Sequence, residues 1–269
     1  MFKSKQLIAK IGRKIKFGIN IPLKVFKKPN NKLSVTSDLF PIRNDEIWST
    51  EFEFLNLPGL IQGDISSKHK ALMVFFDEHG KQLGQEEIEI NGVGRKTILL
   101  KELLTDNLKN ARTFTVFHKL ENNSINLDGS FMAERGYTGY KLNNLPVKGY
   151  VHGNLDAISF AKNKIQQLGN YGFPKKVYRV QHLLTGPAEY DFIFTNPTKC
   201  KRVKIQPFLE SHGTKIPLKP LFIASLGCDL LNVKLQINQN ARISFRSSLY
   251  LGRPVVFRKT NNSMDVFHG

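Results

Sequence analysis

The chain has 269 residues, of which 41% are apolar and 23% are charged. These fractions exclude a disordered, collagen-like or low-complexity chain, and the length suits one large domain or two of modest size. Two cysteines cannot supply a disulfide framework, and the sequence lacks the run of about 18 apolar residues that a transmembrane helix needs. Basic residues exceed acidic ones, giving a formal net charge of +18.

Much of this charge lies at the N-terminus, where ten lysine and arginine residues and no acidic residue precede Asp38. Four apolar residues are spaced to form one stripe of a helix: Leu7, Ile8, Ile11 and Ile15. Basic amphipathic helices of this kind bind at the interface of anionic membranes. We therefore predict that residues 1–32 form a basic head and tether, and that residues 1–28 bind an anionic membrane surface. The side chains expected to contact lipid include Lys10, Arg13, Lys14 and Lys16.

Other interpretations of the head remain open. Lysines interrupt its apolar residues too often for a secretory signal peptide. An organelle transit peptide would favour Arg and Ser over Lys. A nucleic-acid-binding arm needs only the positive charge, and a helix packed on the rest of the protein needs only the apolar stripe. We favour the membrane surface because the charge and the stripe occur together.

After residue 33 apolar and polar residues alternate, which is typical of half-buried strands. The predicted strands lie at 50–54, 71–76, 86–90, 113–117, 190–194, 203–205, 221–224, 232–237, 241–245 and 255–257. Turn-forming pairs such as His79-Gly80 and Asn91-Gly92 separate several of them. Two helices are also predicted, over 101–110 and 159–168.

Four blocks of residues recur in the same order, which indicates an internal duplication. The matched blocks are Phe52, Phe54 and Asn56 with Phe192, Phe194 and Asn196; Phe75, His79, Gly80 and Ile90 with Phe208, His212, Gly213 and Ile223; Val116, Phe117 and Lys119 with Val256, Phe257 and Lys259; and Asn122, Asn123 and Ser124 with Asn261, Asn262 and Ser263. His79 and His212 each precede a glycine in a predicted hairpin turn, so turn geometry explains them better than a shared active site.

The predicted fold class is all-β, with two tandem β-sandwiches of immunoglobulin-like or jelly-roll type. The first copy is expected at 33–127 and the second at 174–269. A β-rich bridging insert at 128–173 would lie between them, and the basic amphipathic head would precede both copies.

The sequence lacks the nucleotide-binding, nucleophile-elbow, H-E-x-x-H and C-x-x-C motifs. No two histidines are two positions apart, which disfavours a two-cupin metal enzyme. Cys200 and Cys228 lack the spacing of a copper site and are expected to be small buried thiols. We therefore lean towards a protein that is not an enzyme and carries no cofactor.

The predicted insert contains a dense polar and aromatic set: Arg135, Tyr137, Tyr140, His152, Asn154 and Asp156. Aromatic faces stack on sugar rings, and arginine binds carboxylate or phosphate with paired donors. These residues are therefore candidates for binding a glycan or another ligand. An equally open interpretation is a brace between the domains, in which the same groups satisfy one another.

Three histidines could converge where the two copies meet: His152, His182 and His268. With Glu134 or Asp156 they could bind a divalent metal such as Zn or Fe, whose bound water would be nucleophilic. The simpler alternative is three separate histidines at strand ends, bonded to backbone carbonyls.

The expected function is that of a non-enzymatic binding or scaffold protein, peripherally attached to the cytoplasmic face of a membrane. It would recognise a glycan or a partner protein, in a setting such as envelope polysaccharide assembly. Two alternatives remain: a metal-dependent sugar-modifying enzyme that uses the three histidines, and a double-jelly-roll assembly protein whose basic arm binds nucleic acid.

Overall fold

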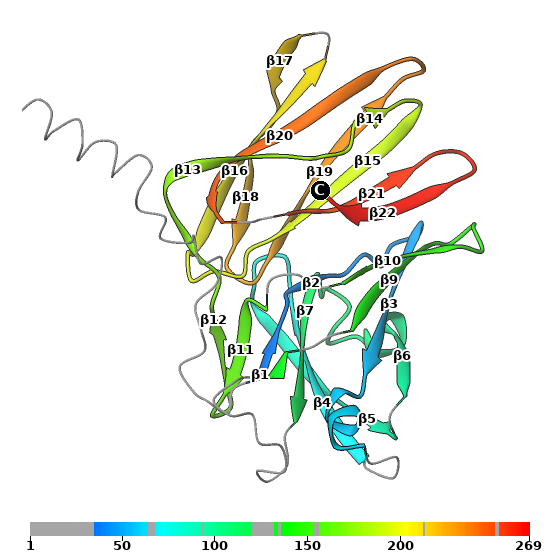
Figure 1. Cartoon of the computed structure of the whole chain (residues 1–269), viewed down its shortest axis with the longest axis vertical. Helices are drawn as coiled ribbons and strands as arrows, with labels where there is room; N and C mark the ends of the chain where they lie inside the picture. The colour runs from blue at the N-terminus through cyan, green and yellow to red at the C-terminus, as the bar shows by residue number, and fades with distance from the viewer. Residues whose placement is uncertain are drawn as a thin grey trace, which may run out of the picture.

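The computed structural model describes residues 35–63, 68–92, 94–119, 132–133, 136–152, 156–211, 213–250 and 253–269. The predicted basic head, with Lys10, Arg13, Lys14 and Lys16, lies outside these residues. Within them the chain is nearly all β, as predicted, and most strands pair in antiparallel sheets (Figure 1). Each predicted strand overlaps a strand of the structure.

Here the first half means residues 35–167 and the second half means residues 171–269. Two four-stranded sheets make up much of the first half. One has the order β10-β9-β3-β6, formed by Lys148–His152, Tyr137–Leu142, Trp48–Leu55 and Arg95–Leu99. The other has the order β2-β7-β4-β5, formed by Phe40–Pro41, Thr113–Lys119, Lys68–Phe76 and Gln82–Asn91. Apolar residues alternate along these strands, so one face of each sheet contributes to a shared core. Phe52 of β3 and Phe114 of β7 meet edge to face in this core, with ring centroids 5.4 Å apart.

A third four-stranded sheet, with shorter strands, has the order β12-β11-β1-β8, formed by Lys164–Gln167, Ile158–Ala161, Val35–Ser37 and Met132–Ala133. Its first two strands occupy the region predicted as a helix over 159–168, so that prediction is wrong. The pair forms a hairpin because Lys162 and Asn163 adopt positive φ angles of 51° and 59° at the turn. Buried Ile158 and half-buried Phe160 then point to the same face, where they pack with Phe117.

The two described helices are short. Helix α2 (Leu57–Gln62) begins at Asn56, whose side chain accepts a hydrogen bond from the Gly59 backbone N–H at 3.1 Å. Helix α3 (Leu100–Leu103) covers only the start of the helix predicted over 101–110, and turns follow it. Buried Leu100 and Leu108 anchor this segment to the core, so tertiary contacts hold it without a longer helix.

The second half also contains two main sheets. One has the order β19-β15-β21-β22, formed by Cys228–Leu235, Ala188–Thr195, Val255–Lys259 and Met264–His268. The six-stranded sheet has β13 (Tyr171–Arg179), β20 (Asn240–Leu249), β16 (Arg202–Ser211) and β17 (Thr214–Pro217) in order, with β14 (Leu184–Thr185) beside β20 and β18 (Leu221–Ala224) beside β16. Phe192, Phe194 and Phe245 contribute to the core that these sheets share.

The strand orders of the two halves correspond. The order β10-β9-β3-β6 has its counterpart in β22-β21-β15-β19, and β2-β7-β4-β5 has its counterpart in β13-β20-β16-β17. Strands β9 and β10 lie in the region predicted as a bridging insert, yet they complete the sheet of β3.

The blocks that repeat in the sequence do not all lie on corresponding strands. Phe52 and Phe192 lie on corresponding strands, β3 and β15, and Phe75 and Phe208 lie on β4 and β16. The block at 116–119 lies on β7, which pairs with β4, whereas its partner at 256–259 lies on β21, which pairs with β15. The strand that occupies the place of β21 in the first half is β9.

A continuous apolar cluster joins the two halves. Trp48, Tyr140 and Val151 from the first half pack against Ile193 and Phe257 from the second. The Phe257 ring lies edge-on to both Trp48 and Tyr140, with centroids 5.1 and 4.8 Å apart. These two sets of strands therefore form one packed body, as Figure 1 shows where β10 lies beside β22.

The β4–β5 turn of the first half also fits closely against the second half. Gly80 has a φ of +77°, and a Cβ built on it would lie 1.7 Å from the Ser225 carbonyl oxygen. Gly213 has the same φ, but apart from its chain neighbours no atom of a described residue lies within 4 Å of its Cβ position. The two glycines therefore share one backbone conformation and differ in their surroundings.

Substituting each of these two glycines by alanine distinguishes the cost of backbone strain from the cost of steric overlap. Gly213→Ala should lower the free energy of unfolding by about 1–2 kcal/mol, because a left-handed conformation is unfavourable for alanine. Gly80→Ala should cost about 1–3 kcal/mol more, because its methyl group must displace the Ser225 backbone. Urea denaturation of both variants measures the difference, and equal losses would contradict this close fit between the halves.

Candidate functional site

The junction between the halves contains a buried ion pair. Arg43 precedes β3 and Asp191 lies on β15, and their Nη2 and Oδ2 atoms are 2.6 Å apart. The Arg43 guanidinium lies between the Trp48 and Phe257 rings, 4.9 and 4.8 Å from their centroids. Both charged side chains are at least 87% buried. The pair and its aromatic neighbours therefore fix how the halves dock.

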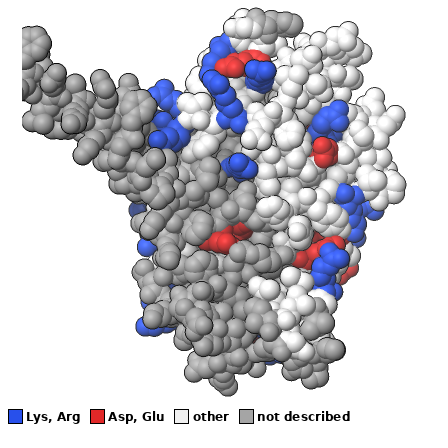
Figure 2. Space-filling view, viewed as in Figure 1, with Lys and Arg blue, Asp and Glu red and all other residues white. Residues whose placement is uncertain are grey.

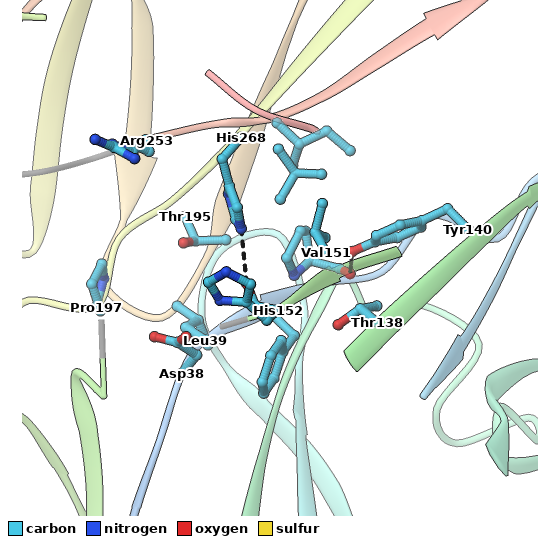
Figure 3. A pocket seen from close by; sticks show the side chains of 14 residues that line it. Asp38, Leu39, Thr138, Tyr140, Val151, His152, Thr195, Pro197, Arg253 and His268 are labelled. Atoms are coloured by element: carbon cyan, nitrogen blue, oxygen red, sulfur yellow. Dashed lines mark hydrogen bonds between the residues drawn. The ribbon is translucent and has the colours of Figure 1, made fainter. Parts of the chain in front are cut away.

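His152 and His268, two of the three histidines considered as metal ligands, lie together at the same junction. The Nε2 atom of His268 donates to the backbone carbonyl of His152 at 2.8 Å, and the rings lie 5.7 Å apart (Figure 3). Burial lowers the pKa of His268, and the hydrogen bond to the His152 carbonyl opposes this shift only in part. With a hydrogen on Nε2, the buried Nδ1 atom is left as an acceptor, and no partner for it is described.

A cavity of about 40 Å³ adjoins these rings. Asp38 and Thr138 line it from the first half, and Thr195 and Arg253 line it from the second (Figure 3). It has room for a water molecule but falls far below the roughly 300 Å³ of small-molecule sites. The cavity is therefore a gap at the junction, too small for a sugar ring.

His182 does not complete a metal site with the other two histidines. Its ring packs on Phe267 at 4.4 Å, while His268, the next residue, turns towards His152. Among the described residues, no group of three or more His, Cys, Asp or Glu side chains is placed to hold a metal ion. Glu134, a candidate fourth ligand, lies outside the described residues.

The predicted ligand-binding set is divided by the fold. Tyr140 is fully buried and its hydroxyl donates to the Pro41 carbonyl at 2.8 Å, so it braces the junction. Tyr137 is 43% exposed and stands edge-on to His152, 6.2 Å away. Asp156 is half-buried, with a positive φ of 43°. Arg135 and Asn154 lie outside the described residues.

A larger polar groove lies on the outer face of the β10-β9-β3-β6 sheet. Its volume is about 500 Å³, within the range of small-molecule sites. Three lysines line it, namely Lys101, Lys141 and Lys148, and the other polar lining residues are Asn44, Asp45, Ser49, Thr50, Glu51 and Asn143. Strands β3, β9 and β10 carry most of these side chains, so the groove has a rigid base.

Glu51 is neutralised within this groove. Its carboxylate accepts hydrogen bonds from Lys148 Nζ, at 2.7 and 2.8 Å, and from the Tyr150 hydroxyl at 2.8 Å. Burial and the Glu51 carboxylate raise the pKa of Tyr150, so its hydroxyl stays protonated and donates. With Lys148 paired to Glu51 and Arg43 paired to the other lining carboxylate, Asp45, the remaining Lys101 and Lys141 give the groove a positive charge.

Sequence reasoning identified neither Glu51 nor Lys148. Glu51 and Glu53 both fall at polar positions of the same alternating strand, yet only the Glu51 side chain is almost fully buried, at 7% exposure compared with 19%. The difference arises because β10 places Lys148 and Tyr150 over Glu51. A sequence without strand pairings contains no signal for this arrangement.

None of the described helices is long and apolar enough to cross a membrane. No protein-family model matches the chain, and no curated protein matches it significantly.

Proposed function

We propose that the chain consists of two β-sandwiches that arose by duplication. The corresponding strand orders of the two halves support this, as do Phe52 and Phe192 on corresponding strands. On this proposal the first sandwich includes β9 and β10, so it extends to about residue 152.

We propose that the protein is a non-enzymatic binding or scaffold protein whose groove on the β3 sheet takes an acidic glycan. The carrying observation is a groove of about 500 Å³ in which Lys101 and Lys141 lie beside amide and hydroxyl groups. Ammonium groups pair with carboxylates, and amides hydrogen-bond to sugar hydroxyls. Tyr150, which is 41% exposed beside Glu51, adds an aromatic surface.

The proposed attachment is to the cytoplasmic face of a membrane. The support is the sequence of residues 1–28, in which basic residues surround an apolar stripe. Attachment there would suit a protein that holds a glycan precursor or a partner of an envelope polysaccharide pathway.

The groove is tested with the full chain and a hexamer of galacturonic acid, with maltohexaose as the neutral probe. We expect the acidic probe to bind and Lys101→Ala/Lys141→Ala to weaken binding at least tenfold, which corresponds to about 1.4 kcal/mol. The matched control is Lys96→Ala/Lys109→Ala, which removes two exposed lysines elsewhere.

Isothermal titration calorimetry measures the affinities. The control variant should bind the acidic hexamer as the wild type does. Equal binding of the two hexamers by the wild type, or unchanged binding after removal of the groove lysines, would overturn the proposed site.

A further inference from the structure

The six-stranded sheet of the second half has a strongly basic outer face. Basic side chains alternate with buried residues along β16 and β20, and the strand pairings bring those of β13 and β17 to the same side, giving seven in all: Lys175, Arg179, Arg202, Lys204, Lys215, Arg242 and Arg246. All seven are exposed, and Glu210 is the one acidic residue on the six strands of this sheet. We call these seven residues the basic face.

The basic face is broad because its strands are adjacent. Val177 of β13 lies opposite Arg246 of β20, which lies opposite Gln206 of β16. Each strand therefore brings its cations to the same side of the sheet. Figure 2 shows Lys and Arg side chains recurring over the upper part of the molecule, where this sheet lies.

The corresponding sheet of the first half is charged in a different way. On β4 and β7, Lys68, Lys70 and Lys119 each pair with a glutamate of β5, either Glu87 or Glu89. On the basic face, the ion pair between described residues is Lys215 with Glu210, at 3.2 Å. Among the described residues, the excess of positive charge on this sheet thus belongs to the second half, where one of the seven cations has an acidic partner.

We propose that the basic face docks on an anionic lipid surface, as a second contact beside the head. This deepens the proposed attachment to a membrane and rests on it. The argument is charge complementarity: the phosphates of a bilayer lie in a plane, and basic side chains spread over one sheet face can meet many of them together. Exposed Val177 adds apolar contact among the cations.

The aromatic groups of the face favour lipid over single-stranded nucleic acid. Base stacking needs open ring surfaces. The Phe222 ring is already covered by Arg202, 4.5 Å from its centroid, and Lys204 lies 5.8 Å away. Lys215 similarly covers Phe208 at 4.8 Å. The cations that we propose to contact phosphate therefore cover the ring faces that would otherwise stack on bases.

The test is co-sedimentation of the full chain with vesicles of phosphatidylcholine, either alone or with 30% phosphatidylglycerol, at low and high salt. The face variant is Lys175→Glu/Arg179→Glu/Arg246→Glu. Its matched control, Lys96→Glu/Lys109→Glu/Lys164→Glu, changes the net charge equally on other surfaces. A head variant, Lys10→Glu/Arg13→Glu/Lys14→Glu/Lys16→Glu, separates the two contacts.

We expect the head variant to keep part of its binding to anionic vesicles at low salt. Adding the face substitutions to the head variant should remove that remaining binding. In the otherwise unchanged chain, the face variant should need at least tenfold more anionic lipid for half-maximal sedimentation, and the control should need less than threefold more. Circular dichroism should show that all variants keep the wild-type β signal.

Two results would overturn the inference. One is complete loss of binding in the head variant together with normal binding in the face variant, which leaves the head as the sole anchor and the attachment intact. The other is normal vesicle binding by the face variant together with loss of binding to a single-stranded oligonucleotide, which would assign the face to nucleic acid. If the wild-type chain binds no vesicles at all, the proposed attachment to a membrane is itself rejected.

Discussion

Replacing Asp191 with leucine should lower the free energy of unfolding by about 3–5 kcal/mol. The substitution leaves the Arg43 guanidinium buried between two aromatic rings without its closest carboxylate, and an unpaired buried charge is costly. Asp45, at 3.4 Å from Arg43 Nε, is half exposed and offsets only part of this cost. Urea denaturation at neutral pH measures the loss.

Two further variants identify the cause. Adding Arg43→Met to Asp191→Leu should recover much of the lost stability, because an apolar pair of similar volume avoids the desolvation of both charges. Glu210→Ala, which removes an exposed ion pair with Lys215, should cost no more than about 1 kcal/mol. If Asp191→Leu behaves like Glu210→Ala, the ion pair does not hold the halves together.

Acidification should destabilise the protein through His118. This residue lies on β7, is 2% exposed and packs against the Phe54 ring at 5.0 Å. Burial, with a smaller contribution from His69, lowers the pKa of its imidazole to about 3. In the unfolded chain the group takes up a proton near pH 6.5, whereas in the folded chain it stays neutral until about pH 3.

The contribution of neutral His118 to the free energy of unfolding is therefore fully present above pH 6.5, and it is lost as the pH falls towards 3. At pH 4 the loss from this one group should be about 3 kcal/mol. His118→Leu should remove that share of the pH dependence, whereas His79→Leu, at an exposed turn, should leave it in place. Urea denaturation at pH 7 and pH 4 compares the variants. If His118→Leu loses as much free energy of unfolding between pH 7 and pH 4 as the wild type does, His118 is not the cause of the pH dependence.

The strands could be predicted because alternation along the chain directly reflects alternation across a sheet. Val116 and Phe117 resemble Val256 and Phe257 for the same reason, although β7 and β21 pair with different neighbours. Similar strands produce similar short patterns wherever they lie. Pairing depends on contacts between distant residues, which is why the place of β9 and β10 was not predicted.

The candidate sites show the same limit. His152 and His268 were expected to converge with His182 where the two copies meet, and the two of them lie together at the junction between the halves. The groove depends on Lys148 reaching Glu51 across strands that are far apart in the sequence. The 159–168 segment was mistaken for a helix because the conformations of Lys162 and Asn163 create a turn where the sequence has no glycine or proline.

Hydrogen exchange of the full chain with and without anionic vesicles tests most directly whether the protein works on a membrane surface. With phosphatidylglycerol vesicles at low salt, we predict slower exchange in residues 1–28 and in strands β13, β16 and β20, and no change with phosphatidylcholine alone. Unchanged exchange in all these segments with anionic vesicles would contradict the membrane-bound role.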